Sequence, residues 1–277
     1  MTNADQATAW NEGSGLNWVA LDTELEHVHG AVTPALLAHA QPRPGERIID
    51  IGCGSGAVTQ AAADAAPGGH ALGVDISAPL LDLARQKRSG AVSFALGDAQ
   101  THPFEPGAAD LVVSRFGVMF FDDPVAAFSN IRAALRPGGR IALACWAPLS
   151  ENPWFAIPGK ATAARMGPVE PPPPHAPGPG GLSDTAHALG ILDQAGFTGS
   201  AVSTEALTFT HPAGASGAAA TMMGVGPAAR IIKERGGTQA DFDAILAAVE
   251  AGYAAHARGG TLALPARVHI YTAQNPG

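Results

Sequence analysis

The chain has 277 residues, of which 46% are hydrophobic and 14% charged, a balance that excludes a disordered polar chain and allows one large or two small domains. The formal net charge is −8 with no basic patch, which argues against a nucleic-acid partner. Two cysteines exclude a disulfide framework and a four-thiolate zinc site. No run approaches the ~20 apolar residues that span a membrane.

The N-terminal residues indicate where the protein works. Residues 1–15 contain acidic side chains and no Lys or Arg, whereas signal and transit peptides are basic. We therefore expect a cytoplasmic protein that is not inserted into a membrane.

The first two thirds of the chain predict helices followed by strand–helix alternation. Residues 16–40 read as one or two helices. Between 46 and 144, short apolar runs alternate with helical patterns, which favours parallel strands with helices on both faces. The predicted strands are 46–52, 70–76, 91–98, 109–116 and 139–147, and the predicted helices are 57–66, 78–88 and 122–135.

The late part of the chain is less regular. PPPPHAPGPGG (171–181) must be an extended loop. Residues 183–195 predict a helix capped by Ser183, and 214–258 predict Ala-rich helices. Two further strands are expected, at 197–210 and 267–273.

Together these elements predict an α/β fold with a doubly wound, mostly parallel, seven-stranded Rossmann-like sheet. We expect a single domain over 1–277. It would comprise N-terminal helices (1–43), a ligand-binding core (44–147), and a late helical cap with the closing strands (148–277).

The most informative motif is a glycine loop between the first strand and its helix. The sequence DIGCGSG (50–56) provides residues that tolerate positive φ and leave room for a ligand. Ligands of such folds bind beyond the carboxyl ends of the strands. The spacing Gly52-x-Gly54-x-x-Ala57 also fits a dinucleotide fingerprint, so the loop alone does not decide the ligand.

Three acids narrow the choice. Asp75 ends the second strand, where a carboxylate accepts both ribose hydroxyls. Asp98 ends the third strand, where it can accept from an adenine amino group. Asp50 begins the glycine loop, where its charge would oppose a pyrophosphate and suit a cationic or zwitterionic ligand.

These segments resemble a known family. DIGCGSG (50–56), VDIS (74–77), GDA (97–99) and LRPGGR (135–140) are similar to the ordered motifs of class I S-adenosylmethionine-dependent methyltransferases. The resemblance is to the small-molecule enzymes of ubiquinone and menaquinone biosynthesis, and it covers roughly residues 44–147. Segments 10–18 and 145–155 also look like bacterial members.

The resemblance assigns residues around the methionine part of the cofactor. Gly52, Cys53 and Gly54 would pass close to it, and Asp50 would contact its amino group. Ser114 and Arg115, at the end of the fourth strand, would lie beside the methyl group.

It also assigns the adenosine part. Asp75 would hold the ribose, and Ile76 would pack on adenine. Gly97, Asp98 and Ala99 would lie at the adenine edge. Trp18, from the N-terminal helices, would close over the cofactor.

No catalytic residue is evident, because methyl transfer from a sulfonium depends mainly on alignment. His211 is a base candidate, and Arg115 is a weak catalytic candidate expected to pair with an acid or an anionic substrate. His27 and His29 are expected to be solvated helix positions. No metal site is predicted.

The resulting hypothesis is methyl transfer from S-adenosylmethionine, with S-adenosylhomocysteine as product, to O or N, or to C, of a small and partly apolar molecule. Two alternatives stay open: a nicotinamide-dependent oxidoreductase, and an S-adenosylmethionine-binding protein with non-methylating sulfonium chemistry. The late helices would cap the substrate or form a homodimer interface.

Overall fold

The computed structural model describes residues 3–277 and centres on one mixed sheet. Over this range eight strands are ordered β3-β2-β1-β4-β5-β8-β6, with β7 paired to β8. The prediction of seven strands holds for the main path, and the eighth is the two-residue β7. The strands are β1 (Arg47–Ile51), β2 (His70–Asp75), β3 (Val92–Leu96), β4 (Ala109–Arg115), β5 (Leu135–Trp146), β6 (Thr198–His211), β7 (Ala257–Arg258) and β8 (Thr261–Gln274).

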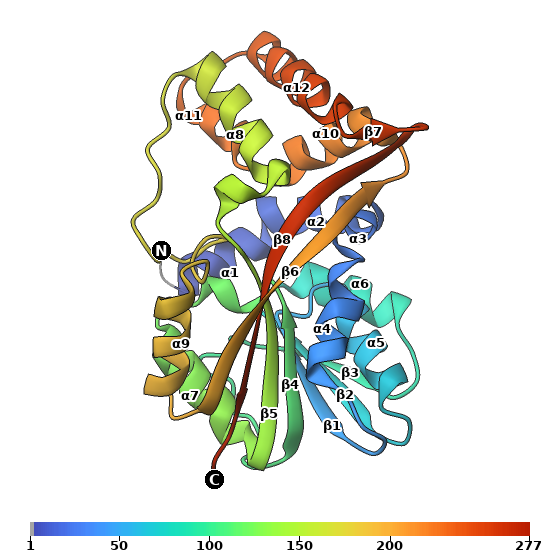
Figure 1. Cartoon of the computed structure of the whole chain (residues 1–277), viewed down its shortest axis with the longest axis vertical. Helices are drawn as coiled ribbons and strands as arrows, with labels where there is room; N and C mark the ends of the chain where they lie inside the picture. The colour runs from blue at the N-terminus through green and yellow to red at the C-terminus, as the bar shows by residue number, and fades with distance from the viewer. Residues whose placement is uncertain (1–2) are drawn as a thin grey trace.

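The five strands β1 to β5 pair in parallel, and β8 runs antiparallel to both of its long neighbours. Leu111, Val112 and Val113 of β4 are fully buried, which explains the continuous apolar run in the sequence. Figure 1 shows α4 (Val32–Ala40) and α5 (Ala57–Ala65) on one side of the sheet and α7 (Pro124–Ala134) and α9 (Thr185–Gln194) on the other, so the sheet is doubly wound. The connecting helices are α5 (Ala57–Ala65), α6 (Ala78–Lys87), α7 (Pro124–Ala134) and α9 (Thr185–Gln194).

Four helices precede β1: the first three lie near the carboxyl ends of the strands, and the fourth lies against one face of the sheet. They are α1 (Asn3–Asn11), α2 (Gly13–Ala20), α3 (Asp22–His29) and α4 (Val32–Ala40). The sequence predicted helix from residue 16 onward and missed α1. This helix is weakly amphipathic and is held by tertiary contacts, because Asn11 accepts from the amide of Ala78 at 2.9 Å and donates to the carbonyl of Ile76 at 2.8 Å.

A second group of helices packs together above the sheet in Figure 1. It consists of α8 (Pro153–Met166), α10 (Gly214–Val225), α11 (Ala228–Glu234) and α12 (Gln239–Ala254), joined by contacts of α12 with α8 and α10. Two short 3-10 turns, η1 (Val118–Phe120) and η2 (Leu149–Glu151), complete the chain. We call α8 and α10 to α12 the upper helices.

Several predicted boundaries change. Asp184, rather than Ser183, caps α9, since its carboxylate accepts from the amides of Ala186 and His187. Strand β5 starts at Leu135 rather than 139, where a register shift lets Leu135 pair with Ala109.

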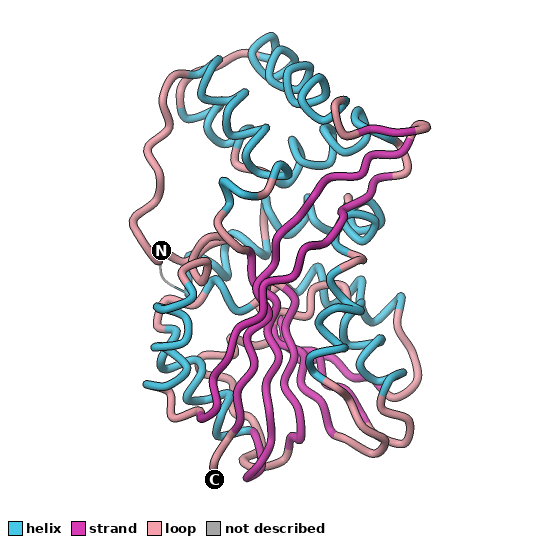
Figure 2. The backbone as a smooth tube through the Cα atoms, in the orientation of Figure 1, coloured by secondary structure: helices cyan, strands magenta, loops and turns pink. Residues whose placement is uncertain are grey.

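The closing strand is also longer than predicted, and α8 was missed. Strand β8 begins at Thr261, because its first half extends beyond the parallel strands and pairs there with β6. The pairing continues through Pro265, which lies opposite Thr208. Figure 2 shows this ribbon of β6 and β8 rising from the sheet to the upper helices. No helix within the described residues 3–277 is long and apolar enough to cross a membrane.

Candidate active site

The glycine loop has the backbone that its composition predicts. Gly52, Gly54 and Gly56 adopt φ values of 65°, 54° and 77°, which side chains other than glycine rarely adopt. A Cβ on Gly52 would lie 2.5 Å from the Cα of Gly117, so the segments that follow β1 and β4 approach too closely there for any side chain. The Cβ position of Gly54, by contrast, has no atom within 4 Å, so the loop leaves its backbone open at that residue.

Asp50 provides an unsatisfied buried carboxylate beneath this loop. It is 1% exposed; its Oδ2 accepts from the Thr59 hydroxyl at 2.7 Å, and its Oδ1 has no hydrogen-bond partner among residues 3–277. Desolvation raises the pKa of Asp50 to about 7. A buried acceptor without a hydrogen-bond partner destabilises the fold, so a cationic donor that binds to this oxygen would be stabilising.

Asp75 joins the end of β2 to the glycine loop. Its two oxygens accept from the amide of Gly54 at 2.7 Å and from the amide of Ser77 at 2.8 Å. Burial raises its pKa, and backbone hydrogen bonds oppose that rise. Each carboxylate oxygen keeps a further acceptor site, so Asp75 can orient the loop and still accept from a ligand hydroxyl.

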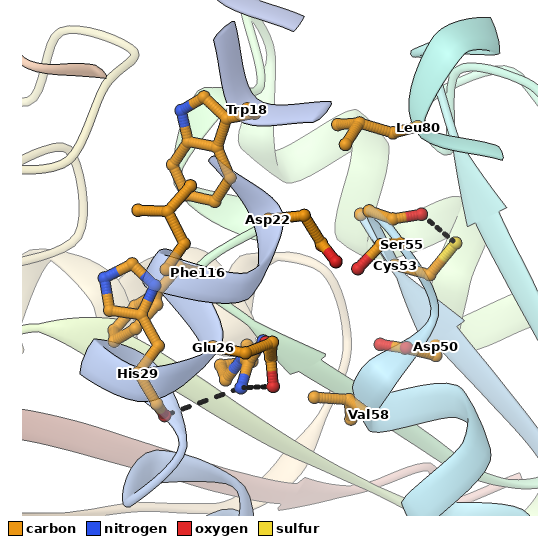
Figure 3. A pocket seen from close by; sticks show the side chains of 14 residues that line it. Trp18, Asp22, Glu26, His29, Asp50, Cys53, Ser55, Val58, Leu80 and Phe116 are labelled. Atoms are coloured by element: carbon orange, nitrogen blue, oxygen red, sulfur yellow. Dashed lines mark hydrogen bonds and ion pairs between the residues drawn. The ribbon is translucent and has the colours of Figure 1, made fainter. Parts of the chain in front are cut away.

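A pocket opens between the glycine loop and the N-terminal helices (Figure 3). In the view of Figure 3, Cys53, Ser55 and Leu80 lie on one side, and Trp18, His29 and Phe116 lie on the other. The predicted site residues that line it are Trp18, Asp50, Gly52, Cys53, Gly54 and Arg115. The structure therefore brings together the residues assigned to the methionine side, with the exception of Ser114.

Arg115 is paired inside this pocket, as the sequence predicted for a lone charge in an apolar run. Its guanidinium forms an ion pair with Glu26 and donates to the Thr33 hydroxyl at 2.9 Å. Glu26 lies on α3, which carries no recognisable motif. Glu26 and Asp22, which both line the pocket, therefore could not be predicted as pocket residues from the sequence.

The residues assigned to the adenine edge lie outside the pocket lining and beneath α1. The Asp98 carboxylate accepts from the side chain of Asn3 at 2.7 Å and from the amide of Gln100 at 2.9 Å. Ile76 is joined to α1 by the Asn11 contact described above. The Ala99 carbonyl accepts from Asn130 at 2.9 Å.

Two other predicted residues shape the backbone. A Cβ on Gly97 would lie 2.4 Å from Nδ1 of His102, so a side chain directly after β3 would displace the His102 ring. Ser114 is fully buried, and its hydroxyl donates to the carbonyl of Ile51 at 2.7 Å. Ser114 therefore ties β4 to β1 just below the glycine loop.

His211, the base candidate, does not line this pocket. It is 2% exposed, and its Nδ1 accepts from the amide of Ala213 at 3.2 Å. Its Nε2 lies 3.3 Å from the Thr221 hydroxyl, and desolvation lowers its pKa. These contacts close the turn between β6 and α10.

The expectation that His29 is solvated is wrong. His29 is 4% exposed and lines the pocket, because α3 turns this face toward the sheet. Desolvation, followed by the charge of Arg115, lowers its pKa to about 3, so the ring is neutral. His27, two residues earlier, remains exposed as predicted.

The chain is similar in sequence to known methyltransferases. Residues 49–143 match the methyltransferase-domain family. The chain is 33% identical over 186 residues to nocamycin O-methyltransferase of Saccharothrix syringae, covering 65% of this chain and 55% of that one. It is 36% identical over 104 residues to demethylmenaquinone methyltransferase of Clavibacter sepedonicus, covering 37% of this chain and 42% of the relative. The chain spans about half the length of the curated relatives it matches.

A solved structure supports the fold. It is phosphoethanolamine N-methyltransferase 2 of Haemonchus contortus, in complex with phosphomonomethylethanolamine and S-adenosylhomocysteine. It superposes with a TM-score of 0.52 at 21% identity, over 89% of this chain and 52% of that one. The predicted fold and the resemblance are confirmed: residues 49–143 are a methyltransferase domain, in a chain with the Rossmann-like fold of the class I S-adenosylmethionine-dependent methyltransferases.

Proposed function

We propose that this chain transfers a methyl group from S-adenosylmethionine to an oxygen or nitrogen, or to a carbon, of a small and partly apolar molecule. The observation that carries the proposal is the unpartnered, buried Oδ1 of Asp50 at the glycine loop. A cationic amino group placed there would satisfy that oxygen and favour its ionised form. The methyltransferase-domain match over the same residues supports this ligand.

The residues present fit the cofactor. Asp50 would bind its ammonium group, the loop backbone from Gly52 to the open position at Gly54 would lie along its methionine part, and Asp75 would accept from its ribose. When bound, the cofactor supplies an electrophilic methyl on a sulfonium leaving group. The chain's own work is then to align the acceptor and exclude water, and both tasks suit a small pocket with aromatic walls.

We also propose that the late part of the chain, 148–277, selects the acceptor, within a single domain that spans 1–277. The upper helices stand above the carboxyl ends of the strands, where a cap over the acceptor would lie. The relative named for O-methylation supports oxygen among the acceptor atoms. A homodimer through the same helices is the competing use of this surface.

The proposal is tested by isothermal titration with S-adenosylmethionine. Asp75→Ala removes a ligand acceptor and a contact of the glycine loop, so binding should weaken by about 1–3 kcal/mol. The matched control is Asp82→Ala, an exposed carboxylate on α6 that pairs with Arg85. Absence of binding by the wild-type protein would refute the proposal.

The two alternatives are separated by further measurements. A nicotinamide cofactor would place its pyrophosphate near Asp50, which is electrostatically unfavourable, and a thermal-shift panel with NAD and NADP tests it. Non-methylating sulfonium chemistry would leave the product without the mass of one added methylene unit, which mass spectrometry detects.

A further inference from the structure

The two oxygens of the buried Asp50 carboxylate have different surroundings. Asp50 is 1% exposed and Thr59 is 0% exposed. The Thr59 hydroxyl donates to Oδ2 at 2.7 Å, whereas Oδ1 has no hydrogen-bond partner within the described range 3–277. Of these two residues only Asp50 lines the pocket, and Figure 3 shows it at the pocket wall between Cys53 and Val58. Thr59 can therefore act on a bound ligand only through Asp50.

The start of α5 explains why Thr59 donates to this carboxylate. Thr59 is the third residue of the helix. A threonine within a helix can donate its hydroxyl hydrogen to the carbonyl four residues earlier, which here belongs to Ser55. That carbonyl accepts instead from Nε of Arg88 at 3.1 Å. A hydroxyl has one hydrogen to donate, and Asp50 accepts it, so this bond joins α5 to β1 beside the glycine loop.

Gly73 on β2 leaves the space that the Thr59 side chain occupies. It is the partner of Asp50 in the parallel pair of β1 and β2. A Cβ on Gly73 would lie 2.9 Å from the Thr59 hydroxyl oxygen and 2.8 Å from Sγ of Cys53. Both distances are too short for van der Waals contact, so a side chain on Gly73 would displace Thr59 or Cys53. The hydroxyl is therefore closely packed against both strands, and close packing fixes its orientation.

The hydrogen bond from Thr59 favours the ionised form of Asp50. Burial raises the pKa of Asp50, and the Thr59 hydroxyl is the strongest of the contacts that lower it. The charge of Arg115 also lowers this pKa, and the charge of Asp75 raises it. The titratable or charged side chains that surround Asp50 or line the same pocket are Asp22, Glu26, His29, Cys53, Asp75 and Arg115. Loss of the Thr59 hydroxyl would shift Asp50 toward its protonated form.

Resting on the proposed function, we propose that Thr59 is a positioning residue for the cofactor: its hydroxyl holds Oδ2 of Asp50, so that Oδ1 of the ionised carboxylate is presented to the cofactor's ammonium group. The ammonium donates to Oδ1, which has no other partner in the described part of the chain. Because Thr59 already holds the carboxylate, it does not reorient when the ligand binds, and binding costs less conformational entropy.

The binding test compares two probes by isothermal titration: S-adenosylmethionine, and 5′-methylthioadenosine, which has the same adenosine group and no ammonium group. Thr59→Val replaces the hydroxyl with a methyl group of similar size. It should weaken S-adenosylmethionine binding about tenfold, the value of one hydrogen bond, and leave 5′-methylthioadenosine binding unchanged. Thr59→Ser keeps the hydroxyl and should restore the wild-type ratio of affinities. Thr162→Val, at a buried threonine of α8, is the matched control.

The pH dependence of binding distinguishes positioning from a purely structural role. In the wild type, S-adenosylmethionine should bind more weakly as pH falls through about 7, because a proton on Asp50 then competes with the ligand. Thr59→Val should move this midpoint upward by about one pH unit, since the carboxylate loses a hydrogen bond that favours its ionised form. Thr162→Val should leave the midpoint unchanged.

Three results for Thr59→Val would each overturn the inference: an unchanged ratio of the two affinities, an equal loss of affinity for both probes, or an unchanged midpoint. If Thr59→Val does not fold, Thr59→Ala removes the same hydroxyl without adding a methyl group beside Asp50, and the same three results decide. Absence of S-adenosylmethionine binding by the wild type would instead refute the proposed function itself.

Discussion

Ionisation of Asp50 should favour the binding of a cationic ligand and lower the stability of the fold. Burial raises its pKa to about 7, so the folded protein holds this proton more tightly than the unfolded chain does. The stability that this proton contributes is present below about pH 4 and is lost as pH rises through about 7. An ionised Asp50 is nevertheless the form that attracts a cationic ligand.

Asp50→Asn should therefore change the pH dependence of folding. Between pH 5 and pH 7 the wild type should lose up to about 1.4 kcal/mol of unfolding free energy per pH unit relative to the variant, which cannot ionise. Urea denaturation at pH 5 and pH 8 measures this difference. Asp64→Asn, an exposed carboxylate on α5, is the control, and parallel pH profiles of Asp50→Asn and wild type would contradict the prediction. The variant should also bind S-adenosylmethionine more weakly.

The predictability of individual residues depended on local signals. Asp50, Gly52 and Asp75 stand in a glycine loop or at a strand end, where local chemistry restricts residue type. His29 has no such signal. Its helix turns one face to solvent at His27 and another to the sheet, and only packing shows which face is buried.

At the scale of elements, hydrogen bonds to other segments stabilise α1 more than its intrinsic helix propensity does. Asn11 bridges α1 to the backbone after β2, and the Ser77 hydroxyl donates to the carbonyl of Trp10 at 2.6 Å. Since α1 covers the residues assigned to the adenine edge, its attachment should control access to that edge.

Asn11→Ala should loosen this helix. Loss of two hydrogen bonds should raise amide hydrogen exchange in residues 3–11 by about tenfold, with little change in the sheet. Asn17→Ala removes a comparable bond, from α2 to the carbonyl of Gly224 in α10, and should leave α1 unaffected. Equal exchange in α1 for both variants would show that other contacts hold the helix.

Strands and connecting helices between 46 and 147 were predicted closely, because apolar runs, caps and glycine turns all agree there. Helix α8 was missed, since Pro153, Pro158 and Gly159 weaken its pattern. Pro158 has no N–H for the carbonyl of Trp154, and the hydroxyl of Tyr253 donates to that carbonyl instead, at 2.8 Å. A helix completed by a side chain nearly a hundred residues away leaves no local signal.

At the scale of the whole molecule, the hydrogen bond from the Tyr253 hydroxyl to the Trp154 carbonyl joins two of the upper helices. Trp154 lies on α8, and Tyr253, which stacks on it at 6.0 Å, lies on α12. Both residues are buried, so the Tyr253 hydroxyl provides the hydrogen bond for a carbonyl that water cannot reach. The cohesion of the proposed cap therefore depends on it.

Tyr253→Phe should destabilise the protein by about 1–3 kcal/mol, because a buried carbonyl loses its partner. Amide exchange should rise mainly in α8 and α12. Tyr271→Phe is the matched control, since its hydroxyl donates to the carbonyl of Leu182 at 2.8 Å outside the upper helices. The prediction fails if exchange in the upper helices is the same in both variants.

The sequence by itself determined the sheet core, the glycine loop and the acids at the strand ends, because these depend on hydrophobic period and local backbone geometry. Tertiary structure alone decided the partner of Arg115, the burial of His29 and the completion of α8. Each of these joins residues from separate segments, and the free energy of such a contact depends on its surroundings after folding. The sequence of the glycine loop therefore indicates the ligand, whereas the residues that line the opposite side of the pocket are known only from packing.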